Sequence, residues 1–322
     1  MKKLSTVVVI MLTLLLAGLA QAADQVDPET PSYKKMSGVS GSINSIGSDT
    51  MNNLMAYWCE DFAKLYPNVK CQIEGKGSST APPALIQATA QLGPMSRSMK
   101  NSEIDEFEKK FGYKPTQIKT ALDGIGVFVN KDNPIKGLTM DQVDAMFSKT
   151  LKCGGKEEIK TWGQLGATGE WASRGISLYG RNAASGTYGF FKEHALCKGD
   201  FKNEVKEQPG SSSVVQGVAE DRNAIGYSGI GFVTSGVRAV PLAPKGSKDF
   251  KEPTLDNIIK EIYPLGRFLY IYVNKAPNKP LDPLVREFVT FILSKEGQQT
   301  VIKDGFYPIP SGISSEQIKA VK

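Results

Sequence analysis

The sequence predicts an α/β protein with two lobes. Of its 322 residues, about 300 remain once an N-terminal export segment is set aside, and a chain of that length usually exceeds one hydrophobic core. Strand-like and helix-like segments alternate along it, which is typical of α/β units with parallel strands. Two long apolar segments, at 119–130 and 267–274, are expected to be strands that cross between the lobes.

The N-terminus has the pattern of an export signal. Lys2 and Lys3 precede an apolar run at 7–19, and Ala20-Gln21-Ala22 then forms a small-residue cleavage site. The run is shorter than the roughly 20 residues that a membrane span needs, and no cysteine stands directly after it. We therefore expect a signal peptide over 1–22, cleaved near Ala22/Ala23, and a mature protein in the periplasm.

Charge and cysteine content narrow the class of protein. Without Lys2 and Lys3 the formal net charge falls from +6 to +4, and no long basic block occurs, so nucleic acid is not an expected partner. The cysteines are Cys59, Cys71, Cys153 and Cys197. An even number in an oxidising compartment indicates disulfides, for which three connectivities are possible.

We favour Cys59–Cys71 and Cys153–Cys197, because each pair would then stay within one lobe. The alternative of a metal site has little support, since the sequence has no C-x-x-C and a single histidine, His194. No metal and no cofactor are expected.

The first half of the chain has these elements in order. Residues 23–38 are polar and contain two prolines, so we expect a flexible leader. A strand at 41–46 leads to a helix at 51–66, whose apolar residues have helical spacing and which Pro67 stops. A strand at 69–73 and a helix at 82–90 follow; this helix has prolines in its first turn, where they are tolerated. A strand end at 92–95 and a helix at 102–111 complete this half.

The second half repeats the alternation. After the crossing strand at 119–130 we expect strands at 176–179 and 224–227 and helices at 188–196 and 214–220. The second crossing strand leads to a helix at 284–293 that returns to the first lobe. The expected division is lobe I over 39–122 and 275–322, and lobe II over 123–274.

Three segments combine glycine with small hydroxyl residues just before an expected helix: residues 47–50, 75–80 and 185–187. A helix N-terminus leaves N–H groups unpaired and carries about half a positive charge. Each segment is therefore a candidate cradle for an anion. The alternative is that each is an ordinary N-cap. Segments from both lobes could face one ligand in the cleft.

Arg181 adds a cation four residues before Ser185. A guanidinium presents a planar fork that can grip two oxygens of one oxyanion. A surface ion pair is the alternative. Together with the three cradles, Arg181 predicts a site for a tetrahedral oxyanion.

At these motifs the sequence resembles the phosphate-binding proteins of ABC importers. Residues 181–187, RNAASGT, are similar to that family's Arg-x-x-x-Ser-Gly-Thr motif, and residues 75–79, GKGSS, resemble its Gly-x-Gly-Ser-Ser loop. Residues 47–50 are similar to its first ligand loop, and AIGY at 224–227 to one of its strands. The similarity extends in order from about residue 41 to 310.

The resemblance implies a two-lobed periplasmic-binding-protein-like fold of type II, in which both lobes close over inorganic phosphate. It also implies a membrane permease as partner and no enzymatic activity, and we expect a monomer. The ligand-binding residues expected on this basis are Ser48, Asp49, Thr50, Ser78, Ser79, Thr80, Ser96, Arg97, Arg181, Ser185, Gly186 and Thr187.

One position departs from the family pattern. Well-known members carry an aspartate where this chain has Ser96, and that aspartate accepts a hydrogen bond from protonated phosphate. Asp49 stands where those members have a threonine. We hypothesise that Asp49 accepts the phosphate proton while Arg97 balances charge; the alternative is that Asp49 only caps its helix.

Two other functions stay open at this stage. One is a secreted phosphatase-like enzyme on the same fold, which the scarcity of histidine disfavours because such chemistry usually needs a metal or an activated nucleophile. The other is a receptor for a different oxyanion, such as sulfate or molybdate.

Overall fold

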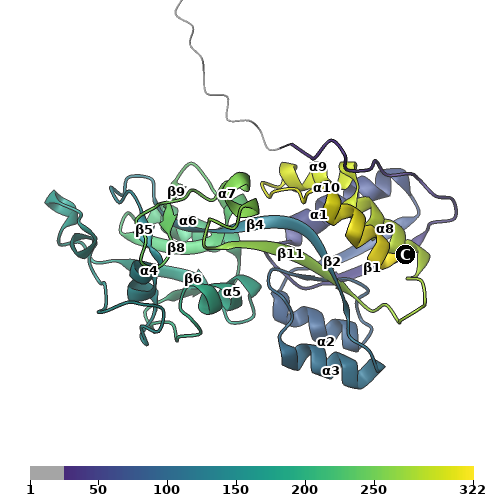
Figure 1. Ribbon diagram of the computed structural model, residues 1–322, viewed down its shortest axis with the longest axis horizontal. Coiled ribbons are helices and arrows are strands. Elements are labelled where there is room, and N and C mark those ends of the chain that lie inside the picture. The colour runs from purple at the N-terminus through teal and green to yellow at the C-terminus, as the bar shows by residue number, and fades with distance from the viewer. Residues whose placement is uncertain (1–24) are drawn as a thin grey trace, which may run out of the picture.

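The computed structural model describes residues 25–322, so the expected signal peptide over 1–22 lies outside the described residues. Figure 1 shows two lobes joined by the long strands β4 and β11, with β1, β2 and helices α1 and α8 to α10 on one side and β5, β6, β8, α4 and α6 on the other. The structure therefore has the predicted two-lobed α/β architecture.

One mixed sheet runs through both lobes in the order β3-β11-β4-β8-β6-β7, and β9 also pairs with β4. Two small parallel pairs, β1 with β2 and β5 with β10, lie outside it. The strands are β1 (Gly41–Ile46), β2 (Val69–Glu74), β3 (Gly93–Met95), β4 (Thr116–Asn130), β5 (Leu138–Thr139), β6 (Ser177–Arg181), β7 (Lys206–Gln208), β8 (Ala224–Gly229), β9 (Val237–Ala239), β10 (Leu242–Ala243) and β11 (Gly266–Val273).

Helices cover the sheet in both lobes. They are α1 (Asn52–Leu65), α2 (Ala81–Ile86), α3 (Asn101–Phe111), α4 (Met140–Phe147), α5 (Gly186–His194), α6 (Ser211–Glu220), α7 (Leu255–Ile259), α8 (Pro283–Leu293), α9 (Lys295–Lys303) and α10 (Ser311–Val321). Short 3-10 turns are also present: η1 (Ser78–Thr80), η2 (Trp162–Leu165), η3 (Gly169–Trp171) and η4 (Ile230–Phe232).

The strand directions differ in part from the expected parallel arrangement. Strand β1 is parallel to β2, and β6 is parallel to β7 and β8. Strand β4, however, pairs antiparallel with β11, β8 and β9. The two crossing strands run in opposite directions because the chain leaves the first lobe through β4 and returns through β11. That geometry cannot be read from the apolar pattern of either strand.

Both ends of the chain build the core of the first lobe. On α1, the buried indole N–H of Trp58 donates to the carbonyl oxygen of Gly297 at 2.7 Å. The ring of Phe62 packs edge-on against that of Phe288 on α8, with centroids 5.2 Å apart. Burying large aromatic side chains dominates core energetics, so this lobe depends on the C-terminal helices.

The described part of the expected flexible leader packs against this lobe. The hydroxyl of Tyr33 lies 2.8 Å from that of Tyr66 and donates to the carboxylate of Glu287 at 3.0 Å. Its backbone N–H donates to Glu296 at 2.8 Å. This part of the leader is therefore anchored to the first lobe, which the polar composition of the segment did not indicate. Tyr33 can anchor it because its ring provides apolar area and its hydroxyl provides a polar end.

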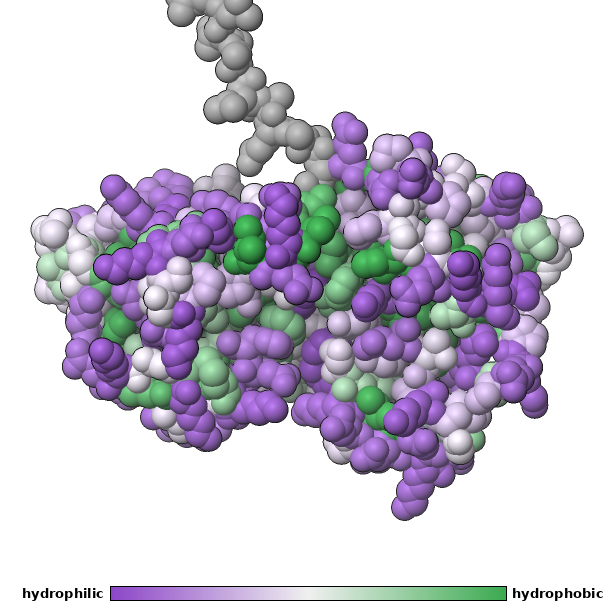
Figure 2. All heavy atoms as spheres, viewed as in Figure 1, coloured by the Kyte–Doolittle hydropathy of each residue, from purple (hydrophilic) through white to green (hydrophobic). Residues whose placement is uncertain are grey.

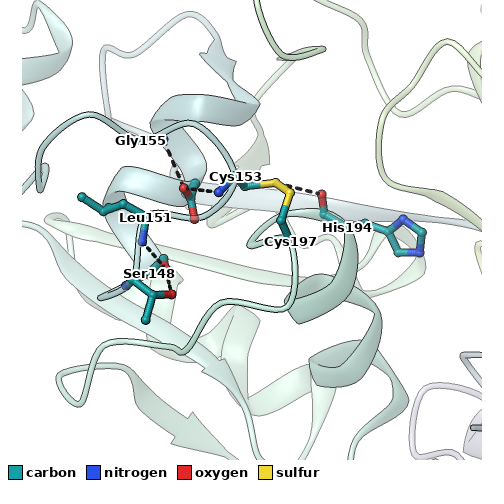
Figure 3. The surroundings of a disulfide bond; sticks show 8 residues. Ser148, Leu151, Cys153, Gly155, His194 and Cys197 are labelled. Atoms are coloured by element: carbon teal, nitrogen blue, oxygen red, sulfur yellow. Dashed lines mark hydrogen bonds between the residues drawn. A yellow bond between two sulfur atoms is a disulfide. The ribbon is translucent and has the colours of Figure 1, made fainter.

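The structure contains the two favoured disulfides, Cys59–Cys71 and Cys153–Cys197, with Cα atoms 6.4 Å and 5.0 Å apart. Figure 3 shows the second one beside the end of α4. There, the carboxylate of Asp144 accepts the backbone N–H groups of Cys153 and Gly155. This disulfide therefore joins the end of α5 to a loop that Asp144 holds in place.

The surface in view is mostly hydrophilic, with small separate apolar areas (Figure 2). Over residues 25–322, no helix combines the length and apolar character needed to cross a membrane.

Asp304 gives a test of this fold. One of its carboxylate oxygens is buried without a partner within residues 25–322, and burial raises the pKa of Asp304 from 3.8 to about 6. Its folded-state pKa exceeds the unfolded value, so its contribution to stability is lost as pH rises from about 4 through 6. We expect Asp304→Asn to raise the free energy of unfolding by about 1 kcal/mol at pH 7, a value reduced for solvent screening of this partly exposed group.

Chemical denaturation at pH 7 and at pH 4 measures this effect, which should disappear at pH 4. Asp105→Asn, at an exposed position of α3, is the matched control and should change stability little at either pH. Equal effects of Asp304→Asn at both pH values would contradict the assignment.

Candidate functional site

The three glycine-containing segments meet in the cleft. Within the first lobe, the backbone N–H of Gly77 donates to Gly47 O and that of Ser48 to Pro94 O, both at 2.8 Å. Across the cleft, the N–H of Ser79 donates to Ala184 O at 3.1 Å. The loops at 47–50, 75–80 and 181–187 are thus bonded to one another, and the lobes are closed.

Buried hydroxyl groups from both lobes cluster at this meeting point. Thr50 Oγ1 lies 3.0 Å from Thr187 Oγ1, and Ser78 Oγ lies 3.3 Å from Ser96 Oγ. These side chains and that of Ser48 are at most 1% exposed. Buried hydroxyls far from solvent must find a partner or lose several kcal/mol, so their gathering indicates a polar site.

Helix α5 points its N-terminus into the cluster. Ser185 caps it, accepting from the N–H groups of Thr187 at 3.1 Å and Tyr188 at 3.3 Å. The cap uses only the oxygen, so its O–H can still donate. A Cβ on Gly186 would overlap the hydroxyl oxygens of Ser78 and Ser96. Only glycine therefore lets this helix end approach the first lobe so closely.

Arg181 lies at the end of β6 with its side chain 1% exposed. Nη1 donates to Ser211 Oγ at 2.6 Å, and Nη2 donates to Pro209 O at 3.0 Å and lies 3.1 Å from the carboxylate of Asp49. Its Nε is buried without a partner among residues 25–322. Burial lowers the pKa of Arg181, and the charge of Asp49 opposes that shift.

Asp49 does not cap α1, which has no side-chain cap. Its carboxylate crosses the cleft, pairs with Arg181, and accepts the backbone N–H of Ser211 at 2.9 Å. Ser211 is the first residue of α6, and a carboxylate at a helix N-terminus is stabilised by the helix dipole. The aspartate thus links the lobes, a role that the motif comparison did not indicate.

Two expected ligand residues are engaged elsewhere. Arg97 donates to both carboxylate oxygens of Glu103 at 2.7 Å, and also to Ser79 Oγ at 3.3 Å. The partner of Asp49 is therefore Arg181 and not Arg97. The hydroxyl of Thr80 donates to Gly77 O within its own loop.

Sequence reasoning missed a buried ion pair behind the site. Arg267 on β11 and Asp123 on β4 lie directly opposite each other in the sheet, with side chains 1% and 0% exposed. Burial raises the pKa of Asp123, and Arg267 opposes that shift. The available indication was a charged residue next to long apolar runs in each crossing strand, Asp123 in β4 and Arg267 in β11, because such residues are almost never fully buried unless paired.

Each of the three arginines at the cleft is neutralised by a carboxylate: Arg97 by Glu103, Arg181 by Asp49 and Arg267 by Asp123. What remains unsatisfied is a set of donors. Among the described residues, no partner is found for Ser48 Oγ, Arg181 Nε or the backbone N–H groups of Thr50, Ser78 and Gly186. Such an arrangement is suited to holding a small anion by hydrogen bonds.

Beside this site lies a cavity of about 1170 Å³, lined in part by Arg97, Ser185 and Arg267. His194 also lines it and stacks on Phe190, with ring centroids 4.0 Å apart. Burial lowers the pKa of His194. Within residues 25–322, no group of three or more histidine, cysteine, aspartate or glutamate side chains could hold a metal ion.

Comparison with known proteins agrees with this architecture. The PBP superfamily domain matches residues 28–296. The phosphate-binding protein PstS of Pseudomonas aeruginosa is 58% identical, over 94% of both chains, and that of Staphylococcus haemolyticus is 28% identical, over 88% of this chain and 85% of the other.

Among solved structures, a putative phosphate ABC transporter substrate-binding protein with bound phosphate, from Clostridium perfringens, superposes with a TM-score of 0.71. It is 26% identical and covers 84% of this chain and all of its own. The match to the superfamily domain extends over most of the chain, and the Pseudomonas relative is matched nearly end to end. The chain therefore belongs to the PstS phosphate-binding proteins of the PBP superfamily.

Proposed function

We propose that this protein is the soluble receptor of an ABC importer and binds inorganic phosphate between its lobes. The observation that carries the proposal is the set of unsatisfied donors in the closed cleft: Ser48 Oγ, Arg181 Nε and the N–H groups of Thr50, Ser78 and Gly186. A tetrahedral oxyanion would accept from all of them, and helix N-termini favour a negative charge there. The relatives are named for phosphate binding, not for catalysis.

Each donor has a proposed role. Thr50 and Ser78 bind from the first lobe through backbone N–H groups, with the hydroxyls of Ser48, Ser78 and Ser96. From the second lobe Arg181 contributes Nε, and Ser185, Gly186 and Thr187 contribute hydroxyl and N–H groups. Ser79, Thr80 and Arg97 hold the loops around the ligand, because their polar groups already bond within the protein.

We propose that Asp49 selects protonated phosphate. Arg181 and Ser211 both contact Oδ2, which leaves Oδ1 available to accept a phosphate hydroxyl. An acceptor-only carboxylate disfavours fully deprotonated sulfate, because two negative groups would face each other.

The rest of the proposal concerns the chain as a whole. Lobe I comprises 39–122 and 275–322, and lobe II comprises 123–274. Phosphate favours the closed arrangement because only that state offers donors from both lobes. The mature protein is a periplasmic monomer after cleavage near Ala22/Ala23, and its closed form delivers phosphate to a membrane permease.

Calorimetry on ligand-stripped protein tests the function. We expect phosphate to bind at micromolar protein, with sulfate and molybdate far weaker. Arg181→Ala should weaken phosphate binding roughly 100-fold or more, since it removes a charged donor and leaves Asp49 unpaired. Arg174→Ala, at a partly exposed arginine paired with Glu170, is the control. Absence of heat with phosphate overturns the proposal, and a larger response to sulfate or molybdate identifies a different oxyanion.

The position of α5 gives a steric test. Gly186→Ala should weaken phosphate binding roughly 10-fold or more, because its Cβ would push the helix away from Ser78 and Ser96 and lengthen hydrogen bonds from both lobes. Gly312→Ala is the matched control: it also lies in the first turn of a helix, α10, but its Cβ would meet nothing within 4 Å. Titration of both variants measures the difference, and equal affinities would show that close approach of α5 is unnecessary.

Selectivity is tested by Asp49→Asn. An amide can donate as well as accept, so this variant should bind sulfate more tightly and phosphate more weakly, lowering the phosphate-to-sulfate affinity ratio roughly 10-fold or more. Competition calorimetry measures this ratio. Asp256→Asn, at an exposed side chain of α7, is the control. If Asp49→Asn keeps the wild-type ratio, Asp49 is not the selecting group.

A further inference from the structure

We propose that Arg267, held by Asp123, is a positioning residue that couples the two halves of the anion site when the lobes close. The inference rests on the proposed function. It concerns the buried pair between β4 and β11, the strands that join the lobes (Figure 1). The side chains of Arg267 and Asp123 are 1% and 0% exposed.

The contacts of Arg267 fix its orientation. Nε and Nη2 donate to Asp123 Oδ2 at 2.9 and 2.6 Å. Nη1 donates to the carbonyl oxygen of Ser96 at 2.8 Å, and Nη2 also donates to Thr187 Oγ1 at 3.0 Å. Four of the five N–H donors of the guanidinium are thus used inside the protein. Arg267 therefore acts through Ser96 and Thr187 and not as a free cation.

These two partners connect to the rest of the site. The backbone N–H of Ser96 donates to Ser78 Oγ at 3.0 Å, and Thr187 Oγ1 lies 3.0 Å from Thr50 Oγ1. Through Ser96 and Thr187, Arg267 is thus one hydrogen bond removed from the loops at 75–80 and 47–50. Thr187 itself lies in the segment 185–187. All three anion-binding segments are therefore connected by hydrogen bonds to the guanidinium of Arg267.

The geometry makes this coupling depend on closure. Asp123 and Arg267 face each other across the joining strands, so the pair can move as a unit when the lobes open. Ser96 follows β3 in the first lobe, whereas Thr187 lies in the first turn of α5 in the second. Arg267 can bond both only when the lobes are together. It therefore stabilises the closed state, the state to which the ligand also binds.

A charge-neutral double replacement, Asp123→Leu with Arg267→Met, separates positioning from simple structural support. Replacing a buried ion pair with apolar residues of similar size is often neutral or stabilising, and it leaves the net charge near the site unchanged. We expect ligand-free protein of near wild-type melting temperature. Phosphate should dissociate roughly 10-fold faster or more, and saturating phosphate should reduce the radius of gyration less than in wild type.

Stopped-flow dissociation, small-angle scattering with and without phosphate, and thermal melting supply the three readouts. Arg238→Met is the matched control: this half-buried arginine of β9 also bonds backbone carbonyls, those of Asn133 and Ile135, within the second lobe. It should lower melting temperature without changing the dissociation rate or the compaction.

The proposal is overturned if the double variant keeps the wild-type dissociation rate and compaction, or if Arg238→Met alters them equally. If the double variant does not fold, Arg267→Lys decides, since it keeps the charge beside Asp123 but loses the fork that reaches both Ser96 and Thr187. If neither variant folds, Arg267 is a structural residue and the proposal fails. Absence of phosphate binding by the wild type would instead overturn the proposed function.

Discussion

Helix N-termini that face one another across a cleft leave N–H groups that no helix can satisfy internally, and the rest of this structure is arranged around that constraint. The first lobe presents Thr50 and Ser78, and the second presents Gly186 at the start of α5. Bringing them together requires small residues at the point of contact, because any Cβ on Gly186 would collide with Ser78 and Ser96. It also requires strands that allow the lobes to meet and separate.

The second constraint concerns the charge of the arginines around the anion site. Arg97, Arg181 and Arg267 are each paired with a carboxylate, so these three side chains offer directed donors without adding net positive charge at the anion site. An anion is then recognised by how many of its oxygens meet a donor, and less by its total charge. That is why Asp49 matters: where the arginines are already neutralised, one acceptor among many donors can distinguish a protonated oxyanion from a deprotonated one.

Local patterns in the sequence predicted the parts of this arrangement that local chemistry determines. The loops before α1 and α5 follow from the spacing of glycine and hydroxyl residues. The disulfide pairing followed from the expected division into lobes, because each pair stays within one lobe. The Arg267–Asp123 pair was not predicted because its partners are 144 residues apart and meet only through the register of β11 against β4. The link from Asp49 to Arg181 and Ser211 was also missed, because it joins residues that are distant in the sequence and meet only when the lobes are closed. The anchoring of Tyr33 was not predicted because two of its partners, Glu287 and Glu296, come from the far end of the chain.

The way Trp58 and Phe62 pack against α8 and the residues of α9 has a consequence for how the chain is made. The first lobe needs both ends of the polypeptide, whereas the segment between β4 and β11 is continuous and can fold as a unit. A chain emerging from the ribosome can therefore assemble its second lobe early, but it cannot complete the first until its last helices exist. Contacts between such distant segments form slowly, so the second lobe can be complete while the first lobe still lacks its last helices.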